Sequence, residues 1–182
     1  MTSTVSNITS DIILQLKSIC GEGNVLTSDL EVFAKDYTED LYFLPEIVLI
    51  PETKEQIAEI LKLANHYRIP VTPRGAGTGL SGGALPVSGG IVISMKRFNR
   101  IIKIDERNFQ AIVEPGVVNE ELQNAVREKG LFYPPDPASK GSCFLGGNVA
   151  HASGGPRALK YGTTRDHVLN LEVVLPTGEI IW

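Results

Sequence analysis

The stretch from Pro70 to Gly90 limits what this chain can fold into more than any other part of the sequence. Its glycines leave a run of backbone amides that no side chain shields; they are Gly75, Gly77, Gly79, Gly82 and Gly83. Because glycine has no Cβ, an oxyanion can approach several successive N–H groups in such a run. The composition therefore predicts a loop that binds phosphate through its backbone.

The two commonest phosphate-binding loops do not fit this run. A Walker loop ends in Gly-Lys-Ser or Gly-Lys-Thr, whereas Leu80–Ser81 stands at that place. A Rossmann loop opens a helix and is followed about 20 residues later by an acidic residue. Gly82–Gly83 and Pro86 prevent such a helix, and Met95–Asn99 offers no carboxylate. Two interpretations remain, a loop that holds an anion through amides alone and a plain glycine-rich surface loop.

Short apolar runs predict the strands that hold this loop. Ile69–Thr72 precedes it and Ile91–Met95 follows it. Upstream, Ile47–Ile50 is a fully apolar strand, and the capping-box pattern Thr53-x-x-Gln56 then starts a helix that reaches Tyr67. This order places the glycine-rich loop at the carboxyl end of a strand, where open α/β sheets bind their ligands.

The first part of the chain is predicted to be a helix and a connection. Apolar residues recur at helical spacing from Ile8 to Ile19, with Thr9 or Ser10 as the cap and Gly21 as the stop. Residues 22–44 are predicted to be mostly loop. An aromatic cluster in that loop is expected to pack against the protein; it consists of Tyr37, Tyr42 and Phe43.

The second half of the chain is predicted to contain strands and one helix. The strands are Ile101–Asp105 and Phe109–Glu114, and Asn119 is expected to cap a helix that ends at Gly130. A long apolar strand is predicted over Val168–Leu175, followed by a tight turn and a strand that runs back.

Two features between these elements indicate a bound ligand. Tyr133–Ser139 is too rich in proline for a helix or a sheet, so it should form a rigid extended wall. A second glycine-rich run follows at Gly146–Gly155. Two glycine-rich runs in one small protein are best explained by a ligand with two ends, one anionic and one flat.

Charge and cysteine content exclude several functions. The net charge of −4 over 182 residues gives no support for a polyanion partner, so no nucleic-acid partner is expected. Cys20 and Cys143 form neither a zinc pattern nor a disulfide framework, and no metal is expected. Met1–Asn7 lacks a signal-peptide pattern, and no apolar run is long enough to cross a membrane. The expected location is cytoplasmic, with peripheral membrane association left open.

Five motifs carry a resemblance to a known family. In chain order they are Pro73–Gly83, Glu114–Val117, Pro134–Ser139, Gly146–Ala150 and Gly154–Gly162. Together they resemble the FAD-linked 2-hydroxyacid oxidoreductases, the family of the glycolate oxidase D subunit and FAD-dependent D-lactate dehydrogenase. The resemblance runs from about Leu44 to Trp182. It implies an FAD-dependent enzyme that oxidises glycolate or D-lactate to the 2-oxo acid by hydride transfer to flavin N5.

The resemblance also implies the fold. Family members have an α+β FAD-binding domain of the vanillyl-alcohol-oxidase (PCMH) type, built from two α+β subdomains. On that pattern, residues 1–44 are an N-terminal helix and connection, and residues 45–182 are a partial FAD-binding domain that is incomplete at its C-terminus. The substrate domain, with the family's metal-binding histidines and its arginine for the substrate carboxylate, is expected to be absent. This chain alone is therefore expected to be inactive.

By the same resemblance the cofactor is FAD, and the matching positions are its candidate ligands. The diphosphate would be held at Pro73, Arg74, Gly75, Ala76, Gly77, Thr78 and Gly79, with Ser81 and Gly82 beside them. The diphosphate and the flavin ring would be lined by Pro135, Asp136 and Ser139. The ribityl chain and the ring would pack along Gly146, Gly147, Asn148 and Gly154, with His151 beside the ring. FAD should be non-covalent, because the first loop has no histidine and Cys143 lacks the spacing of a cysteinyl link.

The sequence assigns no catalytic residue. Family members often carry Glu-Asn-Ala where this chain has His151–Ser153, so contacts near the flavin ring are expected to differ there. His151 is the one histidine near the predicted flavin, and a ligand contact or a structural role is favoured over base catalysis. His66 and His167 are expected to be structural, and Arg74 is expected to anchor its loop.

Two other functions remain open at this point. The chain could be a truncated, non-catalytic flavin-binding fragment, or a small subunit that needs a partner chain. Apolar edge strands after Leu175 would favour such a partner. The chain could also be a peptidoglycan-precursor reductase of the same FAD superfamily, although Thr78–Gly83 suits the hydroxyacid branch better.

Overall fold

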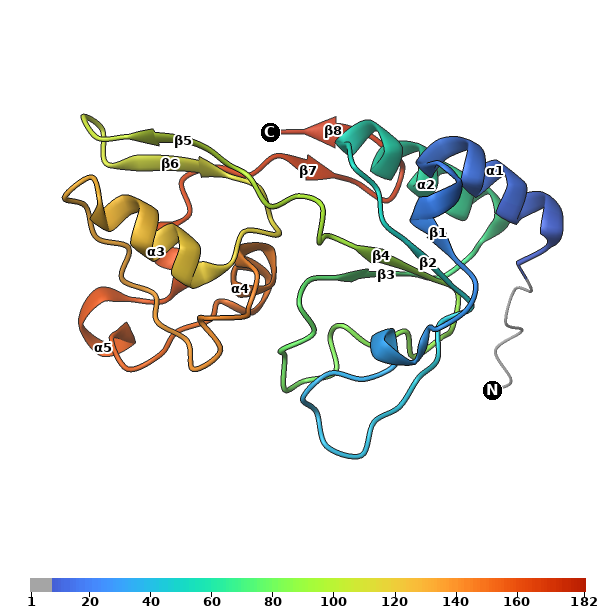
Figure 1. Ribbon diagram of the computed structural model, residues 1–182, viewed down its shortest axis with the longest axis horizontal. Coiled ribbons are helices and arrows are strands. Elements are labelled where there is room, and N and C mark those ends of the chain that lie inside the picture. The colour runs from blue at the N-terminus through green and yellow to red at the C-terminus, as the bar shows by residue number, and fades with distance from the viewer. Residues whose placement is uncertain (1–7) are drawn as a thin grey trace. The chain divides into compact units, whose positions relative to one another are not determined.

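The computed structural model describes residues 8–182, which form two compact units (Figure 1). The first unit ends at Arg97 and also takes in Leu171–Trp182, and the second unit is Phe98–Asn170. Residues 1–7, in which the signal-peptide pattern is absent, lie outside the described residues. Each unit has its own hydrophobic core.

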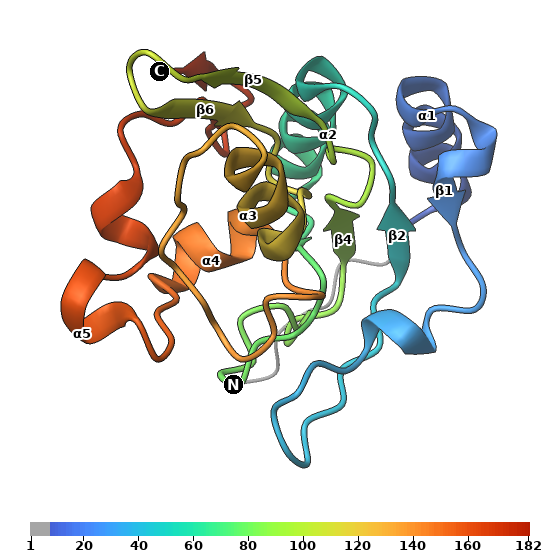
Figure 2. The same cartoon turned by 60° about the vertical axis from the view of Figure 1, so that its left-hand side comes forward.

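The first unit is built on a four-stranded sheet in the order β1-β2-β4-β3. The strands are β1 (Val25–Leu26), β2 (Ile47–Leu49), β3 (Val71–Arg74) and β4 (Ile91–Ser94). β2 and β3 both pair with β4 in parallel, and Figure 2 shows β2 and β4 pointing the same way. The predicted strand–helix–strand unit is confirmed, with β4 inserted between its two strands. Because every residue of β2 and β4 is buried, both faces of this sheet are covered.

Two helices form with the caps that the sequence predicts. In α1 (Ser10–Cys20) the Thr9 hydroxyl accepts the amide of Ile12, and Gly21 ends the helix at a φ of +85°. In α2 (Lys54–Tyr67) the Thr53 hydroxyl accepts the amide of Gln56. The Gln56 side chain turns back to the amide of Glu52, one residue before the cap, so the capping box is offset by one position.

The two helices cover one face of the sheet. Ile12 and Leu16 of α1 and Ile60 of α2 share a buried cluster with Ile47 and Ile91 of the strands. A short 3-10 turn at Glu22–Asn24 joins α1 to β1. The opposite face is covered by the connection after β1, which contains a second 3-10 turn at Glu31–Phe33. Figure 1 shows the helices and the second of these turns on opposite sides of the strands. The first 44 residues, as far as they are described, therefore belong to the core of this unit.

The end of the chain forms a small hairpin in the first unit. β7 (Val173–Val174) pairs antiparallel with β8 (Ile180–Ile181). The turn is the predicted one, since the amide of Gly178 donates to the carbonyl of Leu175 at 2.8 Å. The long strand predicted over residues 168–175 is wrong in length, because only Val173–Val174 pairs with a partner strand. Within residues 8–182, no helix has both the length and the apolar character needed to cross a membrane.

The second unit packs a hairpin and a helix over a small core. β5 (Ile101–Asp105) and β6 (Gln110–Val113) form the hairpin, with a register shift between Ile101 and Lys103. The longest helix of this unit is α3 (Asn119–Arg127). Two shorter helices, α4 (Leu145–His151) and α5 (Ala158–Tyr161), precede a 3-10 turn at Thr164–His167. The core consists of Val117, Leu122, Val126 and Leu145.

Two predictions for this unit are wrong. Asn119 does not cap α3: Val118 occupies the cap position without a side-chain bond, and the Asn119 side chain is fully buried instead. The second glycine-rich run is not a loop throughout, because its first part forms α4 and ends at Ala152 in the left-handed conformation. Glycine disfavours a helix, so the reason for the helix must lie in packing.

Candidate functional site

The first glycine-rich loop leaves the sheet at the carboxyl end of β3, where Arg74 is the last strand residue. Arg74 is only 6% exposed, and its guanidinium points back under the loop rather than out of it. The guanidinium donates to four backbone carbonyls, those of Val32, Phe33, Lys35 and Ala84, at 2.6 to 3.4 Å. Arg74 therefore ties the connection after β1 to the glycine-rich loop, which is the anchoring role that the sequence predicts.

The charge of Arg74 is balanced within the protein. Burial lowers the pKa of the guanidinium, and the nearby Asp36 carboxylate acts in the opposite direction. An arginine stays protonated under such conditions. Since its donors are already engaged by carbonyls, Arg74 contributes the shape of the loop more than a free charge for an anion.

Two further hydrogen bonds join residues 36–38 to the loop, and a third orders that segment itself. The amide of Tyr37 donates to the carbonyl of Gly79 at 3.0 Å, and the amide of Gly82 donates to the Thr38 hydroxyl at 2.8 Å. The amide of Thr38 in turn donates to the Asp36 carboxylate at 2.8 Å. The loop is thus supported along its length by a segment that lies more than 40 residues earlier in the sequence.

The support leaves the amides of the loop available. Among the described residues, the N–H groups of Gly75 through Leu80 donate to no protein acceptor. Gly77 is buried with a φ of +73°, and a Cβ on it would come within 2.8 Å of the Arg74 guanidinium carbon. A run of unpaired amides on a fixed backbone is what an anion-binding loop requires. The bare-amide cradle predicted from composition therefore fits the geometry.

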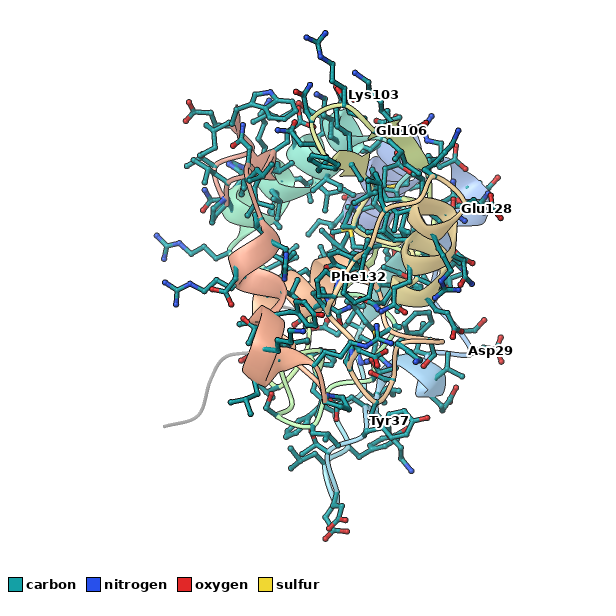
Figure 3. The ribbon with its side chains drawn as sticks, turned by 90° about the vertical axis from the view of Figure 1, so that its left-hand side faces the viewer. Asp29, Tyr37, Lys103, Glu106, Glu128 and Phe132 are labelled. Carbon is teal, nitrogen blue, oxygen red and sulfur yellow. The ribbon has the colours of Figure 1, made fainter. Side chains whose placement is uncertain are left out.

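The aromatic residues of the supporting segment do not pack as predicted. Tyr37 is 70% exposed and Tyr42 is 49% exposed, whereas Phe43 is half-buried. Tyr37 is labelled in Figure 3, where it lies at the outer edge of the unit. The backbone of this segment is held by hydrogen bonds to the loop, so its side chains are free to face solvent.

In the second unit, the proline-rich segment is held by neutral amide side chains. The carbonyl of Pro135 accepts from the Asn119 amide group at 3.1 Å and from the Gln123 amide group at 2.7 Å. Asn148 of α4 donates to the Asn119 side-chain oxygen at 3.2 Å. The three amide side chains are 0–6% exposed. As predicted, residues 133–137 form neither a helix nor a strand, whereas residues 138–140 form a turn. Side chains of α3 hold the Pro135 carbonyl, and Asn148 of α4 holds Asn119 in turn.

Asp136 is held in place by two cations. Its carboxylate contacts the Lys140 ammonium at 2.9 Å and the Arg157 guanidinium at 3.6 Å. The hydrogen bond from Lys140, followed by the charge of Arg157, holds the pKa of Asp136 below its ordinary value. Gly155 lies directly against the Asp136 carbonyl with a φ of +130°, so no side chain fits there. Asp136 therefore stays ionised and braces this loop.

The contacts of α4 explain why this helix contains glycine. A Cβ on Gly146 would lie 2.7 Å from the Pro115 Cβ, so only glycine allows the helix to approach that turn. The amide of Gly146 donates to the Pro115 carbonyl at 2.8 Å, and the amide of Leu145 donates to the Val117 carbonyl at 2.9 Å. Gly147, in contrast, has nothing within 4 Å of the position of a Cβ. The second glycine-rich run thus serves close packing at Gly146.

The histidines do not form a metal site. Within residues 8–182 no group of three potential metal-ligating side chains comes together. His66 lies in the last turn of α2 and stacks edge-on against Tyr67, and His167 lies 3.0 Å from the carbonyl of Tyr161. His151 is the last residue of α4 and is exposed.

Several residues that shape these regions carry no motif. Asp36 and Thr38 lie in a segment without periodicity, so no sequence pattern marks them. The polar sequence of its helix predicts that Gln123 lies on the surface, yet this residue is only 6% exposed. Glu114 does belong to a motif, the one at residues 114–117, and its carboxylate accepts the amide and the guanidinium of Arg100 beside the turn at Pro115. The signal that could have found Gln123 is its place on the same helical face as Asn119 and Leu122.

The sequence matches a known family and several curated proteins. A family described as FAD binding domain matches residues 45–182. The glycolate oxidase subunit GlcD of Bacillus subtilis (strain 168) is 44% identical over 176 residues, which are 96% of this chain and 37% of that protein. The D-lactate dehydrogenase of Anaerostipes hadrus is 39% identical over 181 residues, 97% of this chain and 37% of that protein. The chain thus spans about 37% of the length of these relatives.

Solved structures resemble the chain as well. Alkyldihydroxyacetonephosphate synthase matches with a TM-score of 0.84 and 24% identity, over 93% of this chain and 34% of that chain. The p-cresol methylhydroxylase structure with substrate bound matches with a TM-score of 0.80 and 27% identity, over 93% of this chain and 34% of that chain. The predicted fold, a mixed α and β domain of the vanillyl-alcohol-oxidase (PCMH) type, is confirmed.

Proposed function

This chain belongs to the family of FAD binding domains, and from that premise we propose that it is the cofactor-binding part of an enzyme that oxidises a 2-hydroxy acid. FAD is its cofactor, as the resemblance implies. The substrate we propose is glycolate or D-lactate, because two similar proteins are named for glycolate oxidation and for D-lactate dehydrogenation.

The observation that carries the proposal is the run of unpaired amides from Gly75 to Leu80 on a loop held by Arg74. We assign the FAD diphosphate to this loop, at positions 73–79 with Ser81 and Gly82 beside them. The flavin end is assigned to the second unit, at Pro135, Asp136, Ser139, Gly146, Gly147, Asn148, His151 and Gly154. The buried amide network around Pro135 supports this second assignment, because it gives a fixed wall for a flat ring.

The chemistry divides between the cofactor and the protein. Bound FAD would accept the α-hydrogen of the 2-hydroxy acid as a hydride, while the hydroxyl proton leaves to a base. The residues of this chain bind and orient: the loop amides neutralise the diphosphate, and the Pro135 segment is held rigid. We assign the base and the carboxylate anchor to no residue of this chain, and expect them in a further part of the working enzyme.

We propose that FAD is bound without a covalent link. Cys143 is 3% exposed, and its sulfur contacts the Asn148 amide at 3.3 Å. The first loop contains no histidine. Acid precipitation of the FAD-loaded chain is expected to release all the yellow colour into the supernatant, and colour that stays with the pellet would contradict this point.

Titration of FAD into the 182-residue chain tests the proposal. Flavin fluorescence should change saturably as FAD binds. ADP, which carries a diphosphate, should compete with FAD, whereas riboflavin, which lacks one, should compete poorly. A folded chain that binds no FAD at millimolar concentration, or one from which riboflavin displaces FAD as well as ADP does, would overturn the assignment of the loop.

The substrate is tested on the FAD-loaded chain without oxygen. We expect that glycolate, D-lactate and D-2-hydroxyglutarate leave the flavin colour unchanged, because the groups that activate the substrate are proposed to lie elsewhere. Bleaching by one of these acids would show that the chain contains a working substrate site. The name of the Bacillus relative, a glycolate oxidase subunit, supports the proposal that a further polypeptide takes part.

A further inference from the structure

We propose that the segment Val32–Thr38, which precedes the family match at residue 45, is the positioning element of the diphosphate loop. Thr38 and Asp36 are its positioning residues. The inference rests on the proposed function of the loop, and it adds residues that neither the motifs nor the family match includes.

The first observation is that the loop is held from outside its own sequence. Arg74 donates to the carbonyls of Val32, Phe33 and Lys35 as well as to that of Ala84 within the loop region. One buried cation therefore fixes both segments against each other. An arginine fork suits this task because its planar set of donors reaches several carbonyls at once.

The second observation is a short chain of hydrogen bonds that ends in the loop. The Asp36 carboxylate accepts the amide of Thr38, and the Thr38 hydroxyl accepts the amide of Gly82. Tyr37, which lies between Asp36 and Thr38, also reaches the loop, because its amide donates to the carbonyl of Gly79. Gly82 has a φ of +71°, so the chain turns back at the residue that Thr38 holds.

The third observation is the direction of these bonds. The Tyr37 bond takes up a carbonyl of the loop, and the Thr38 bond takes up an amide beyond Leu80, so neither uses the unpaired amides of residues 75–80. A support that occupied those amides would compete with an anion. This support orders the loop and leaves the amides ready, which lowers the ordering cost that a ligand would otherwise meet.

Thr38→Val tests the inference, because valine keeps the shape of threonine and removes the acceptor for the Gly82 amide. Thr38→Ser restores the hydroxyl, and Thr27→Val is the matched control, since Thr27 is exposed in the same connection. Two readouts are used on the full chain. One is hydrogen exchange, without FAD, of the hydrogen-bonded amides of Gly82 and Leu85, and the other is the dissociation constant for FAD.

We expect Thr38→Val to speed exchange at Gly82 and Leu85 and to weaken FAD binding about ten-fold, the effect of losing one hydrogen bond of about 1.4 kcal/mol. Thr38→Ser should recover most of both effects, and Thr27→Val should change neither. Faster exchange with unchanged FAD affinity would overturn the positioning role. Unchanged exchange and unchanged affinity would overturn the inference as a whole.

A second pair of variants tests the other end of the hydrogen-bond chain. Asp36→Asn keeps a side-chain oxygen for the Thr38 amide, whereas Asp36→Ala removes it. Asp36→Ala should therefore speed exchange in the loop more than Asp36→Asn does. The exchange measurement needs no FAD. If the wild-type chain failed to bind FAD, the proposed function would be refuted, but the exchange rates would still show whether Thr38 and Asp36 order the loop. Equal exchange in the two variants would contradict the role of Asp36.

Discussion

The loop after β3 and the segment around Pro135 are both irregular, and the protein fixes them in different ways. The first is held by one buried cation, since Arg74 reaches four backbone carbonyls. In the second, uncharged amides hold the Pro135 carbonyl, since Asn119 and Gln123 both donate to it. The neighbouring Asp136 is held by ion pairs with Lys140 and Arg157. A charged fork concentrates the support in one residue, whereas the amide network divides it among several.

This difference suits what each region is proposed to bind. A loop that meets a diphosphate must keep its amides unpaired, so its support comes from carbonyls and from another segment. A wall for a flat ring needs only a fixed position. Neutral amides hold its Pro135 carbonyl, and the charge of Asp136 is balanced by Lys140 and Arg157. The comparison predicts that Arg74 carries most of the stability of the first region. In the second region the stability should be divided among several residues, so each substitution there should cost less.

The largest effect is expected from Arg74→Met. Removal of the guanidinium leaves four carbonyls without their donor and leaves Asp36 without its cation. We expect the free energy of unfolding to fall by about 3–5 kcal/mol, as when one partner of a buried charge pair is removed. Urea unfolding followed by circular dichroism measures this change. Weak FAD binding by the 182-residue chain should be lost at the same time.

Arg97→Met is the matched control in the same unit. Arg97 lies 3.7 Å from Glu52 and its side chain is 55% exposed, so its loss should cost less than about 1 kcal/mol. If the two arginine variants were equally stable, Arg74 would not be the central support of the loop.

Asn119→Asp is expected to have the second largest effect. A carboxylate at this fully buried position cannot donate to the Pro135 carbonyl, so stability at neutral pH should fall by about 2–4 kcal/mol. Burial would raise the pKa of the new carboxyl in the folded state, so stability should recover as the pH falls and the protonated acid donates again. Unfolding measured from pH 4 to pH 8, at roughly unit steps, tests this direction.

Asn124→Asp, the same substitution at an exposed position of α3, is the control for Asn119→Asp. Asn124 is exposed and accepts from Arg127, which a carboxylate can do equally well. This variant should be as stable as the wild type or slightly more so. A loss in Asn124→Asp as large as that in Asn119→Asp would mean that the effect comes from charge near the helix and not from the amide network.

The sequence predicts the regular parts of both regions and misses their supports. Hydrophobic periodicity and caps place α1, α2 and the parallel strands, because these depend on neighbours within one turn or one strand. The bond between Thr38 and Gly82 joins residues 44 positions apart, and no local pattern reveals it. The same reasoning explains Asn119, whose place before two glutamates resembles a cap although its side chain is needed inside.

The glycines also show that a local sequence pattern does not reveal tertiary contacts. Composition indicates that both runs approach something closely. It does not distinguish Gly77, whose left-handed φ shapes a loop, from Gly146, whose missing Cβ lets a helix pack on Pro115. The Pro115 turn is brought to α4 by tertiary contacts only, so the helical state of the second run could not be predicted from propensity.

Paired glycine substitutions test that distinction. Gly77→Ala is expected to cost about 1–3 kcal/mol, because alanine is strained at a φ of +73° and its Cβ would displace the Arg74 guanidinium. Gly147→Ala should instead stabilise the second unit by about 0.5–1 kcal/mol, since the site is helical and open. Urea unfolding of both variants measures the two signs. If both substitutions destabilised the chain equally, the glycines of the two runs would have the same role.

The smallest effect concerns the turn on which α4 packs. Glu114 forms an ion pair with Arg100 at that turn, and hydrogen bonds from Arg100 lower the pKa of Glu114 below its ordinary value of 4.5. A carboxyl whose pKa is lowered by folding stabilises the protein above its ordinary pKa, and this contribution is lost as the pH falls through the folded value. Because the Arg100 side chain is 75% exposed, water screens the pair, and Glu114→Gln should cost only about 1 kcal/mol at neutral pH.

The pH dependence separates this charge from a purely steric role. The difference in unfolding free energy between the wild type and Glu114→Gln should be constant above pH 5.5 or roughly so, and should shrink as the pH falls below about 4.5 and the wild-type carboxyl becomes neutral. Urea unfolding at several pH values measures the difference. A gap that stays the same across this range would show that shape, and not the ionised carboxylate, fixes the turn. The turn under α4 would then be held by packing, in contrast with the loop that the charge of Arg74 holds.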